Sequence, residues 1–294
     1  MIVQVDGLKK RYKKDWVLKG IDIKIEEPQI IALVGPNGSG KTTLLNCMTN
    51  LLSFNEGSVE VLGKSNKDPS LFYEISYLQD NRILYGNLTA YDHLKFICRV
   101  QKLPVSRIQE VAERVGMTSY LKRRVRNFSL GMKQHLLLAM VILNKPKLLL
   151  MDEPLNGLDP TSAINMRTIL LELYREGTTI IISSHNLDEI DRLTNTIYFM
   201  KDGALLKESL EEITVIHYEL TVSNLVKAKE VLEEAGLPFT MNEEGQLGFK
   251  ETDVPLQKII GLLYGNGIDI QHIDNHKAGA EKRYRELFEE RATV

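Results

Sequence analysis

One glycine-rich segment constrains the fold of this chain more than any other feature. It follows an apolar run at 29–34, which is typical of a buried strand, and it leads into a helical stretch that starts with Thr42 and Thr43. The segment consists of Gly35, Pro36, Asn37, Gly38, Ser39, Gly40, Lys41 and Thr42. A strand, a glycine-rich turn and a helix in this order form a phosphate cradle, because backbone N–H groups and the helix N-terminus converge on anionic oxygens. The segment therefore predicts a nucleotide site in which Lys41 reaches the β- and γ-phosphates and the Thr42 hydroxyl binds Mg²⁺.

Composition limits the classes of protein to which the chain can belong. Its length of 294 residues suggests about two domains, and its net charge of −2 argues against nucleic-acid binding driven by bulk electrostatics. Cys47 and Cys98 are far apart and lack metal-ligand spacing, so we expect reduced thiols in a cytoplasmic protein. The first residues lack the pattern of a signal peptide, and the longest apolar run, 136–143, is shorter than the roughly twenty residues that span a bilayer. We therefore expect a soluble chain that reaches a membrane only through a partner.

Short apolar runs predict the strands of a parallel sheet. These runs lie at 148–151, 179–182 and 197–200. A helical pattern at 160–176 separates the first two, and strands that alternate with helices indicate an α/β sheet covered on both faces. Alternating patterns at 2–5 and 17–25 predict strands of an antiparallel sheet, whereas the pattern is helical from about 89 to 126.

After Gly203 the sequence changes to short strands and helices that follow one another in the order β-α-β-β-α-β. The predicted strands and helices lie at 214–222, 224–235, 238–241, 246–249, 254–264 and 268–273. This is the order of a ferredoxin-like split unit. We therefore expect a small α+β accessory domain at 209–294, which follows a nucleotide-binding domain at 1–208.

Two further segments carry residues suited to phosphate chemistry. The apolar strand at 148–151 is followed by Asp152, which can hold Mg²⁺, and by Glu153, which can orient and deprotonate an attacking water. Ser129 opens a long apolar helix, and beyond its capping role this helix N-terminus can face an anion. Because the chain already has one phosphate loop, a second anion-binding helix start suggests a site that another subunit completes.

Together these motifs resemble those of the ATP-binding cassette (ABC) ATPases, the nucleotide-binding subunits of ABC transporters. The resemblance covers about 1–205 and rests on several separated motifs in the family's order. It implies the ABC cassette of the P-loop NTPases, with a mixed sheet core, an antiparallel β subdomain and a helical signature subdomain at about 83–143. The matching segments are the phosphate loop at 35–42, the signature at 129–134, the strand with its carboxylates at 148–153, the coupling loop at 156–159 and the switch segment at 183–185.

The resemblance also implies roles for single residues. By this match, His185 contacts the γ-phosphate, Tyr12 stacks on adenine, and Ser129 and Gly131 approach the phosphates of the other subunit. Together with the phosphate loop, these residues form the expected ATP site.

The sequence departs from the family pattern in two places. Leu130 and Met132 replace a glycine and a glutamine of the signature, so we expect function with weaker ATP-driven dimerisation. The second departure is at 77–80, where this chain has Tyr-Leu-Gln-Asp and the family commonly has Tyr-Leu-Pro-Gln or Tyr-Leu-Pro-Glu. Either Gln79 or Asp80 could therefore be the residue that senses Mg²⁺. Trp16 is an alternative to the tyrosine for adenine stacking, but we expect it to pack in the core at a strand start.

The mechanism implied by the resemblance is ATP hydrolysis between two copies of the chain. The copies pair head to tail around two ATP molecules. Glu153 then positions the water, Lys41 and His185 stabilise the transferring phosphoryl group, and Asp152 and Thr42 hold Mg²⁺. A separate transmembrane permease docks near the helical subdomain and keeps the ATPase at the inner face of the cell membrane.

The resemblance favours export, and other functions remain as alternatives. The accessory domain resembles extensions on the ATPases of bacterial drug and peptide exporters, whereas importer subunits often carry barrel-like extensions. A soluble ABC ATPase that acts on nucleic acid or ribosomes is a second alternative, but the chain has one cassette and no paired cysteines. A plain P-loop kinase would leave the segments around Ser129 and His185 without a purpose. We expect no nucleic-acid partner.

Overall fold

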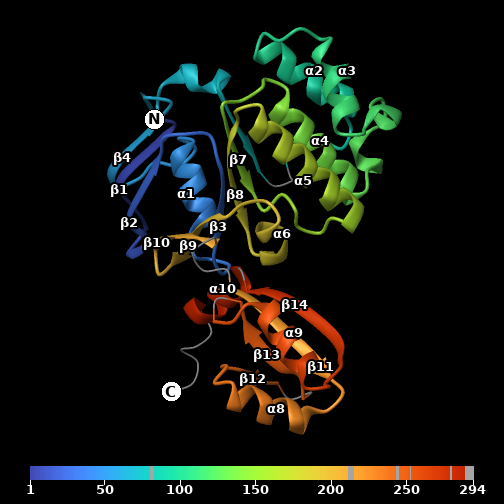
Figure 1. The fold of residues 1–294 in the computed structure, drawn as a ribbon. Coiled ribbons are helices and arrows are strands. Elements are labelled where there is room, and N and C mark those ends of the chain that lie inside the picture. Colours follow the sequence, from blue (N-terminus) through green and yellow to red (C-terminus); the bar gives the residue numbers. More distant parts are fainter. Residues whose placement is uncertain (80–82, 211–214, 243–244, 252, 279, 289–294) are drawn as a thin grey trace. The chain divides into compact units, whose positions relative to one another are not determined.

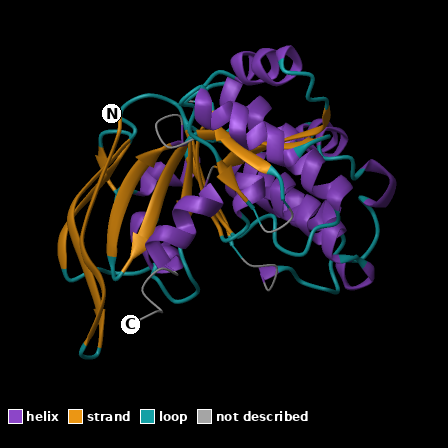
Figure 2. Cartoon of the chain, turned by 60° about the horizontal axis from the view of Figure 1, so that its bottom comes forward, coloured by secondary structure: helices purple, strands orange, loops and turns teal. Residues whose placement is uncertain are grey.

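The computed structural model of the chain forms two compact units, Met1–Glu208 and Ser209–Val294. It describes residues 1–79, 83–210, 215–242, 245–251, 253–278 and 280–288 (Figure 1). Figure 2 shows that the strands lie side by side in sheets, with helices beside them. None of the helices in the described part of the chain combines the length and apolar character needed to cross a membrane.

A six-stranded sheet forms the centre of the first unit, in the strand order β10-β9-β3-β8-β7-β6. Its strands are β3 (Ile30–Val34), β6 (Ile75–Leu78), β7 (Leu148–Asp152), β8 (Thr179–Ser184), β9 (Thr196–Lys201) and β10 (Ala204–Ser209). Strands β6, β7, β8, β3 and β9 pair in parallel. The apolar runs of β3 and β8 are buried along their whole length, as expected for a parallel sheet covered on both faces. The predicted α/β core is thereby confirmed.

The register of this sheet brings the phosphate loop and the carboxylates to one edge. Val34, the last residue of β3, pairs with Ser184, and Asp152, the last residue of β7, pairs with Ser183. The carboxyl ends of three parallel strands therefore meet at the same edge, which is where α/β sheets bind their ligands.

The second sheet of this unit is antiparallel. It has the order β2-β1-β4-β5 and consists of β1 (Val3–Tyr12), β2 (Asp15–Ile25), β4 (Glu56–Val61) and β5 (Lys64–Ser65). One hydrophobic core joins this sheet to the parallel sheet and to α1 (Lys41–Met48), with Leu44 and Leu45 fully buried in it. This core fixes α1 directly behind the phosphate loop.

The helical part of the first unit consists of separate helices. They are α2 (Ala90–Val100), α3 (Arg107–Arg114), α4 (Leu130–Ile142), α5 (Pro160–Arg175) and α6 (Leu187–Asp191). Short 3₁₀ turns lie at Pro69–Tyr73, Thr118–Tyr120 and Val125–Asn127. Pro104 lies in the loop between α2 and α3, where a proline cannot continue a helix. The helical stretch predicted from 89 to 126 is therefore divided.

The second unit has its own sheet and core. The sheet order is β12-β13-β11-β14, and every observed pairing is antiparallel. Its elements are β11 (Val215–Val222), α8 (Leu225–Glu234), β12 (Thr240–Met241), β13 (Leu247–Lys250), α9 (Leu256–Gly265), β14 (Ile270–Ala278) and α10 (Ala280–Phe288). Leu220, Phe249 and Ile259 are among the side chains buried in a separate hydrophobic cluster. The order of elements is that of the predicted ferredoxin-like unit.

One packing prediction is wrong. Trp16 lies in β2 near the turn of the β1–β2 hairpin, and 38% of its surface is exposed. The Arg11 guanidinium lies 5.4 Å from its ring centroid. The side chain is outside the core because this end of the hairpin is exposed as a whole, including Tyr12 at the end of β1 and Asp15 at the start of β2.

Candidate functional site

The phosphate loop lies between β3 and α1, and two of its glycines are required by close packing. A Cβ on Gly35 would lie 2.6 Å from the Met200 carbonyl oxygen. Gly40 is the N-cap of α1 with φ 109°, and a Cβ there would lie 3.0 Å from Val17 Cγ1. Within the described structure no side chain caps α1, so its first N–H groups are open to an anionic ligand.

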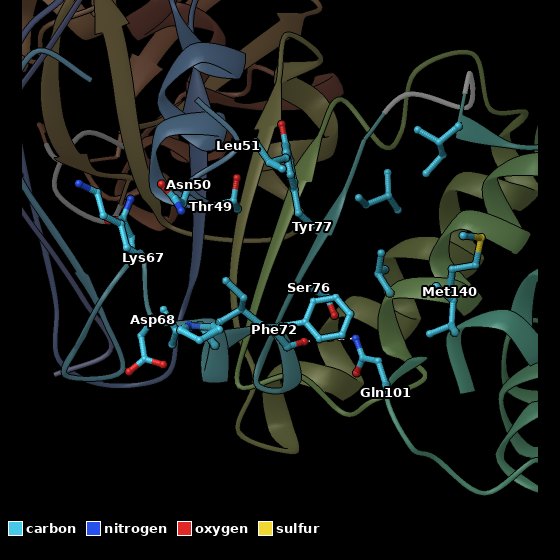
Figure 3. A pocket seen from close by; sticks show the side chains of 18 of the residues that line it. Thr49, Asn50, Leu51, Lys67, Asp68, Phe72, Ser76, Tyr77, Gln101 and Met140 are labelled. Carbon is cyan, nitrogen blue, oxygen red and sulfur yellow. Dashed lines mark hydrogen bonds between the residues drawn. The ribbon is translucent and has the colours of Figure 1, made fainter. Parts of the chain in front are cut away.

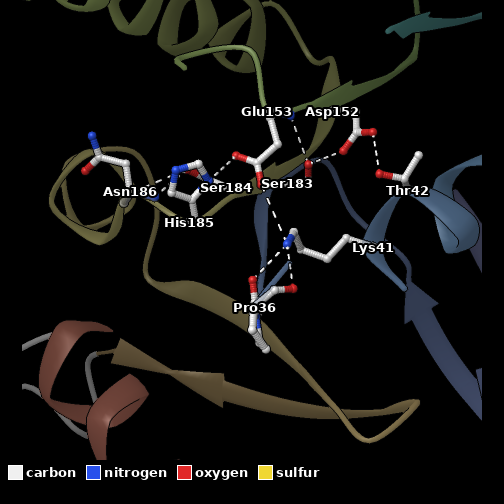
Figure 4. A network of polar contacts seen from close by, with 10 residues as sticks. Pro36, Lys41, Thr42, Asp152, Glu153, Ser183, Ser184, His185 and Asn186 are labelled. Atoms are coloured by element: carbon white, nitrogen blue, oxygen red, sulfur yellow. Dashed lines mark hydrogen bonds and ion pairs between the residues drawn. The ribbon is translucent and has the colours of Figure 1, made fainter. Parts of the chain in front are cut away.

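Lys41 is held at the mouth of the loop. Its side chain is 6% exposed, and Nζ donates to the carbonyl oxygens of Gly35, at 2.7 Å, and Pro36, at 3.3 Å. The same Nζ lies 3.6 Å from Glu153 Oε1 (Figure 4). The ammonium group is thus already placed at the helix start, with backbone acceptors and a carboxylate as its partners.

Thr42 and Asp152 bring two oxygen ligands together at the sheet edge. Thr42 Oγ1 donates to Asp152 Oδ2 at 2.7 Å, although the two residues come from α1 and β7. The other carboxylate oxygen, Oδ1, accepts a hydrogen bond from Ser183 Oγ at 2.5 Å. Tyr77 of β6 lies near this carboxylate, and burial together with the charge of Asp152 raises the pKa of its phenol. A hydroxyl and a carboxylate in contact are the kind of donor set that Mg²⁺ prefers.

Glu153 lies at the centre of a chain of polar contacts. Its backbone is in the left-handed region, with φ 50°, and its N–H donates to both the carbonyl and the hydroxyl oxygen of Ser183. Its Oε2 lies 3.0 Å from Nδ1 of His185, while Oε1 faces Lys41. Because left-handed backbone is unfavourable for a residue with a Cβ, the surrounding contacts are needed to hold it. Figure 4 shows that these side chains converge from α1, β7 and the end of β8.

Of the two candidates for sensing Mg²⁺, the structure describes Gln79. Gln79 directly follows β6, whose last residue, Leu78, pairs with Met151. The backbone of Gln79 therefore emerges at the same sheet edge as Asp152. Asp80 lies outside the described residues.

The signature residues contact the start of α5 within the same chain. Ser129 is the N-cap of α4, and its Oγ accepts from the Met132 N–H at 3.2 Å. A Cβ added to Gly131 would lie 3.1 Å from Ser162 Oγ and 3.6 Å from Asp159 Oδ2. Only a glycine allows α4 and α5 to approach in this way without displacement of a neighbour.

Other predicted ATP contacts are not linked to the network around Glu153. Tyr12, at the end of β1, is 47% exposed, and Lys10 Nζ lies 5.2 Å from its ring centroid. Among the described residues, no hydrogen bond or ion pair joins Tyr12, Ser129 or Gly131 to the residues around Glu153. The phosphate loop, the two carboxylates and His185 thus form one cluster, while the tyrosine and the signature lie on separate elements.

A hollow of about 530 Å³ lies on another part of the first unit (Figure 3). The end of α1, the 3₁₀ turn at Pro69–Tyr73, β6, α2 and α4 line it. Its lining includes the exposed side chains of Leu51, Phe72 and Ile83. Gln101 of the loop after α2 donates to the Phe72 carbonyl oxygen at 3.2 Å and ties two of its walls together. The sequence motifs gave no signal for this hollow, because its walls come from segments far apart in the chain.

Known proteins that are similar to this chain are ATP-binding proteins of ABC transporters, and two of them match it over nearly its whole length. A family model described as "ABC transporter" matches residues 18–156. The ABC transporter ATP-binding protein YcbN of Bacillus subtilis is 36% identical, over 98% of this chain and 97% of the relative. The bacitracin transport ATP-binding protein BcrA of Enterococcus faecalis is 30% identical, over 98% and 96%. The lantibiotic transport ATP-binding protein SrtF of Streptococcus pyogenes is 37% identical, over 72% and 95%.

Solved ATP-binding cassettes have a similar fold over most of the chain. An ATP-binding subunit of an ABC transporter superposes with a TM-score of 0.67 at 24% identity, over 72% of this chain and 92% of its own. A dimeric cassette in a post-hydrolysis state, bound to ADP and Pi, superposes with a TM-score of 0.66 at 24% identity, over 71% and 99%. At this identity the likeness establishes the fold.

Proposed function

Because the chain belongs to the family of ABC transporter ATP-binding proteins, we propose that it hydrolyses ATP to ADP and phosphate and thereby powers a separate membrane permease. The observation that carries this proposal is the single polar network in which Lys41, Thr42, Asp152, Glu153 and His185 meet at the carboxyl edge of one sheet. These residues come from distant segments, and their chemistry matches what phosphoryl transfer to water requires.

In the proposed site, the loop at 35–43 binds the phosphates of ATP. Lys41 exchanges its loop carbonyl partners for phosphate oxygens, which are stronger acceptors because they are charged. Thr42 and Asp152 hold Mg²⁺, which supplies positive charge to the β- and γ-phosphates. For the Mg²⁺-sensing role we propose Gln79, because it directly follows β6 at the same edge, and Asp80 is the alternative.

Hydrolysis requires a base next to the attacking water. Glu153 fills this role in our proposal, since its carboxylate lies between Lys41 and His185 and stays accessible to solvent. It accepts the proton of the water as the oxygen attacks the γ-phosphorus, and the bond from this phosphorus to the β–γ bridging oxygen breaks, so that ADP leaves with that oxygen. Lys41 and His185 then stabilise the negative charge on the transferring group.

We further propose that a second copy of the chain completes each site. Ser129 and Gly131 at the start of α4 are available to the phosphates of a partner, and Tyr12 supplies the adenine contact in its own copy. A head-to-tail pair places each phosphate loop opposite the other copy's α4. The proposal is supported by the description of a solved cassette of this fold as dimeric and bound to ADP and Pi.

The hollow beside α2 is the proposed dock for the permease. Its apolar lining suits a short apolar helix from a cytoplasmic loop, in the manner of a helix-in-groove contact. Such a dock would keep the ATPase at the inner face of the membrane. Export is the proposed direction, because two relatives that match the chain are named for lantibiotic and bacitracin transport. Import by the same machinery is the alternative; co-isolation with the permease and transport into vesicles of known orientation distinguish the two.

The catalytic proposal is tested by ATPase assays on Glu153→Gln. Loss of a general base costs typically 10²–10⁴-fold in rate, so we expect turnover to fall at least about 100-fold while ATP still binds. Glu172→Gln is the matched control, because Glu172 lies on α5 in a surface ion pair with Arg114. A Glu153→Gln protein that turns over at the wild-type rate would remove Glu153 from its proposed role.

A further inference from the structure

Ser183 lies in the switch segment at 183–185, but the motif match gives a role only to His185 of that segment. It pairs with Asp152 in the register of β7 and β8, and its side chain is fully buried. Its Oγ donates to Asp152 Oδ1 at 2.5 Å and accepts from the Glu153 N–H at 2.9 Å. One hydroxyl therefore connects the carboxylate proposed to hold Mg²⁺ with the residue proposed as the base (Figure 4).

The hydroxyl constrains Asp152. Because Oδ1 is bound to Ser183, the carboxylate presents Oδ2 to Thr42, which donates to it at 2.7 Å. Without the serine hydroxyl, the carboxylate could rotate about its terminal torsion, which is broad for aspartate. The oxygen offered to a cation would then no longer be fixed.

The same hydroxyl constrains the backbone of Glu153. This residue adopts φ 50°, and its N–H is shared between the hydroxyl and the carbonyl oxygen of Ser183. A backbone in a sparsely populated region persists only where neighbours hold it. Ser183 thus contacts both carboxylate residues without itself facing the ligand.

We propose that Ser183 is a positioning residue of the ATPase: its hydroxyl fixes the carboxylate of Asp152 for Mg²⁺ and the backbone of Glu153 for water activation. This inference rests on the proposed function. The competing explanation is a buried serine that only satisfies its own hydrogen bonds and contributes to stability.

The adjacent serine offers a matched control. Ser184 lies on the same strand and is equally buried, but its Oγ accepts from the Asn186 N–H at 3.0 Å. In the described structure, its side chain bonds to neither Asp152 nor Glu153. Ser184→Ala therefore removes a buried hydroxyl without touching the carboxylates.

The test measures how ATP binding depends on Mg²⁺ in a Glu153→Gln background, in which ATP is not consumed. Partners that orient metal ligands typically contribute 10–100-fold to metal affinity. Adding Ser183→Ala should raise the Mg²⁺ concentration for half-maximal binding by about 10–100-fold, while ATP binding without Mg²⁺ changes less than about twofold. Adding Ser184→Ala should leave the Mg²⁺ concentration for half-maximal binding unchanged, because its hydroxyl does not bond to Asp152. Equal Mg²⁺ dependence in the two serine variants would overturn the proposal.

A second pair of variants covers the case in which Ser183→Ala does not fold. Ser183→Thr and Ser183→Val have nearly the same shape and differ in the hydroxyl. Thr should keep the Mg²⁺ dependence of the parent and Val should lose it; identical behaviour of the two would contradict the role of the hydroxyl. Because binding requires no turnover, a chain that proves unable to hydrolyse ATP would contradict the proposed function and still report on Ser183.

Discussion

At the scale of single residues, the proposed ATP site requires Lys41 to change partners when a nucleotide binds. Its ammonium group is bound by the carbonyl oxygens of Gly35 and Pro36 and lies 3.6 Å from Glu153. Phosphate oxygens compete with these partners for the same charge. Without nucleotide, the contacts of Lys41 with the loop carbonyl oxygens and with Glu153 hold the site together, and a bound phosphate would replace them.

The sequence predicted several of the residues that the structure brings together, but not how they are held. Lys41, Asp152 and Glu153 each belong to a recognisable motif whose spacing along the chain implies phosphate binding. The role of Ser183 depends on strand register, which pairs residues about thirty positions apart. The positive φ of Glu153 also depends on these tertiary contacts, and no local pattern encodes it.

Two aromatic residues near the β1–β2 turn are candidates for adenine, and their alanine variants separate them. Aromatic stacking on a base contributes about 1–3 kcal/mol, so Tyr12→Ala should weaken ATP binding by roughly 5–150-fold. Trp16→Ala should change ATP binding less than about twofold, because the motif match assigns the adenine contact to Tyr12. Titration of both variants with ATP decides the assignment; the reverse order would move the adenine site to Trp16.

At the scale of elements, sequence patterns located most of the described strands but missed β6. Strand β3 is apolar throughout and β7 and β8 are apolar except at their ends, because both faces of that sheet are covered. The four-residue strand β6 was not predicted, since three of its residues are only partly buried and its pattern is too short to identify. Its pairing with β7 is a long-range contact that the sequence does not display.

The capping box of α2 provides a stability prediction at this scale. The Thr89 hydroxyl accepts from the Asp92 N–H, and the Asp92 carboxylate accepts from the Thr89 N–H. Thr89→Ala should therefore lower the free energy of unfolding of the first unit by about 1 kcal/mol. Ser106→Ala at the start of α3 is the control and should change it little, because Ser106 makes no capping hydrogen bond. Urea denaturation followed by circular dichroism measures both; equal losses would show that the cap is not the cause.

At the scale of the whole molecule, each unit has a separate hydrophobic core. The cluster around Leu44 belongs to the first unit and the cluster around Phe249 to the second. The sequence predicted a new domain after Gly203, because the predicted strands and helices follow a β-α-β-β-α-β order from there on.

Separate cores predict two thermal transitions. Phe249 is 2% exposed, and truncation of a buried phenylalanine costs about 3–5 kcal/mol. Phe249→Ala should lower the midpoint of one transition and leave the other within about 1 °C, as measured by scanning calorimetry. A single transition that shifts as a whole would mean that the two units unfold cooperatively.

The central claim is that ATP is bound between two copies of the chain. Sedimentation of the Glu153→Gln protein with ATP and Mg²⁺ tests it most directly, because this variant is expected to retain ATP without hydrolysing it. We predict a dimer that dissociates when ATP is removed and fails to form when Ser129→Arg is added in the same background. A protein that remains monomeric with saturating ATP and Mg²⁺ would contradict the account.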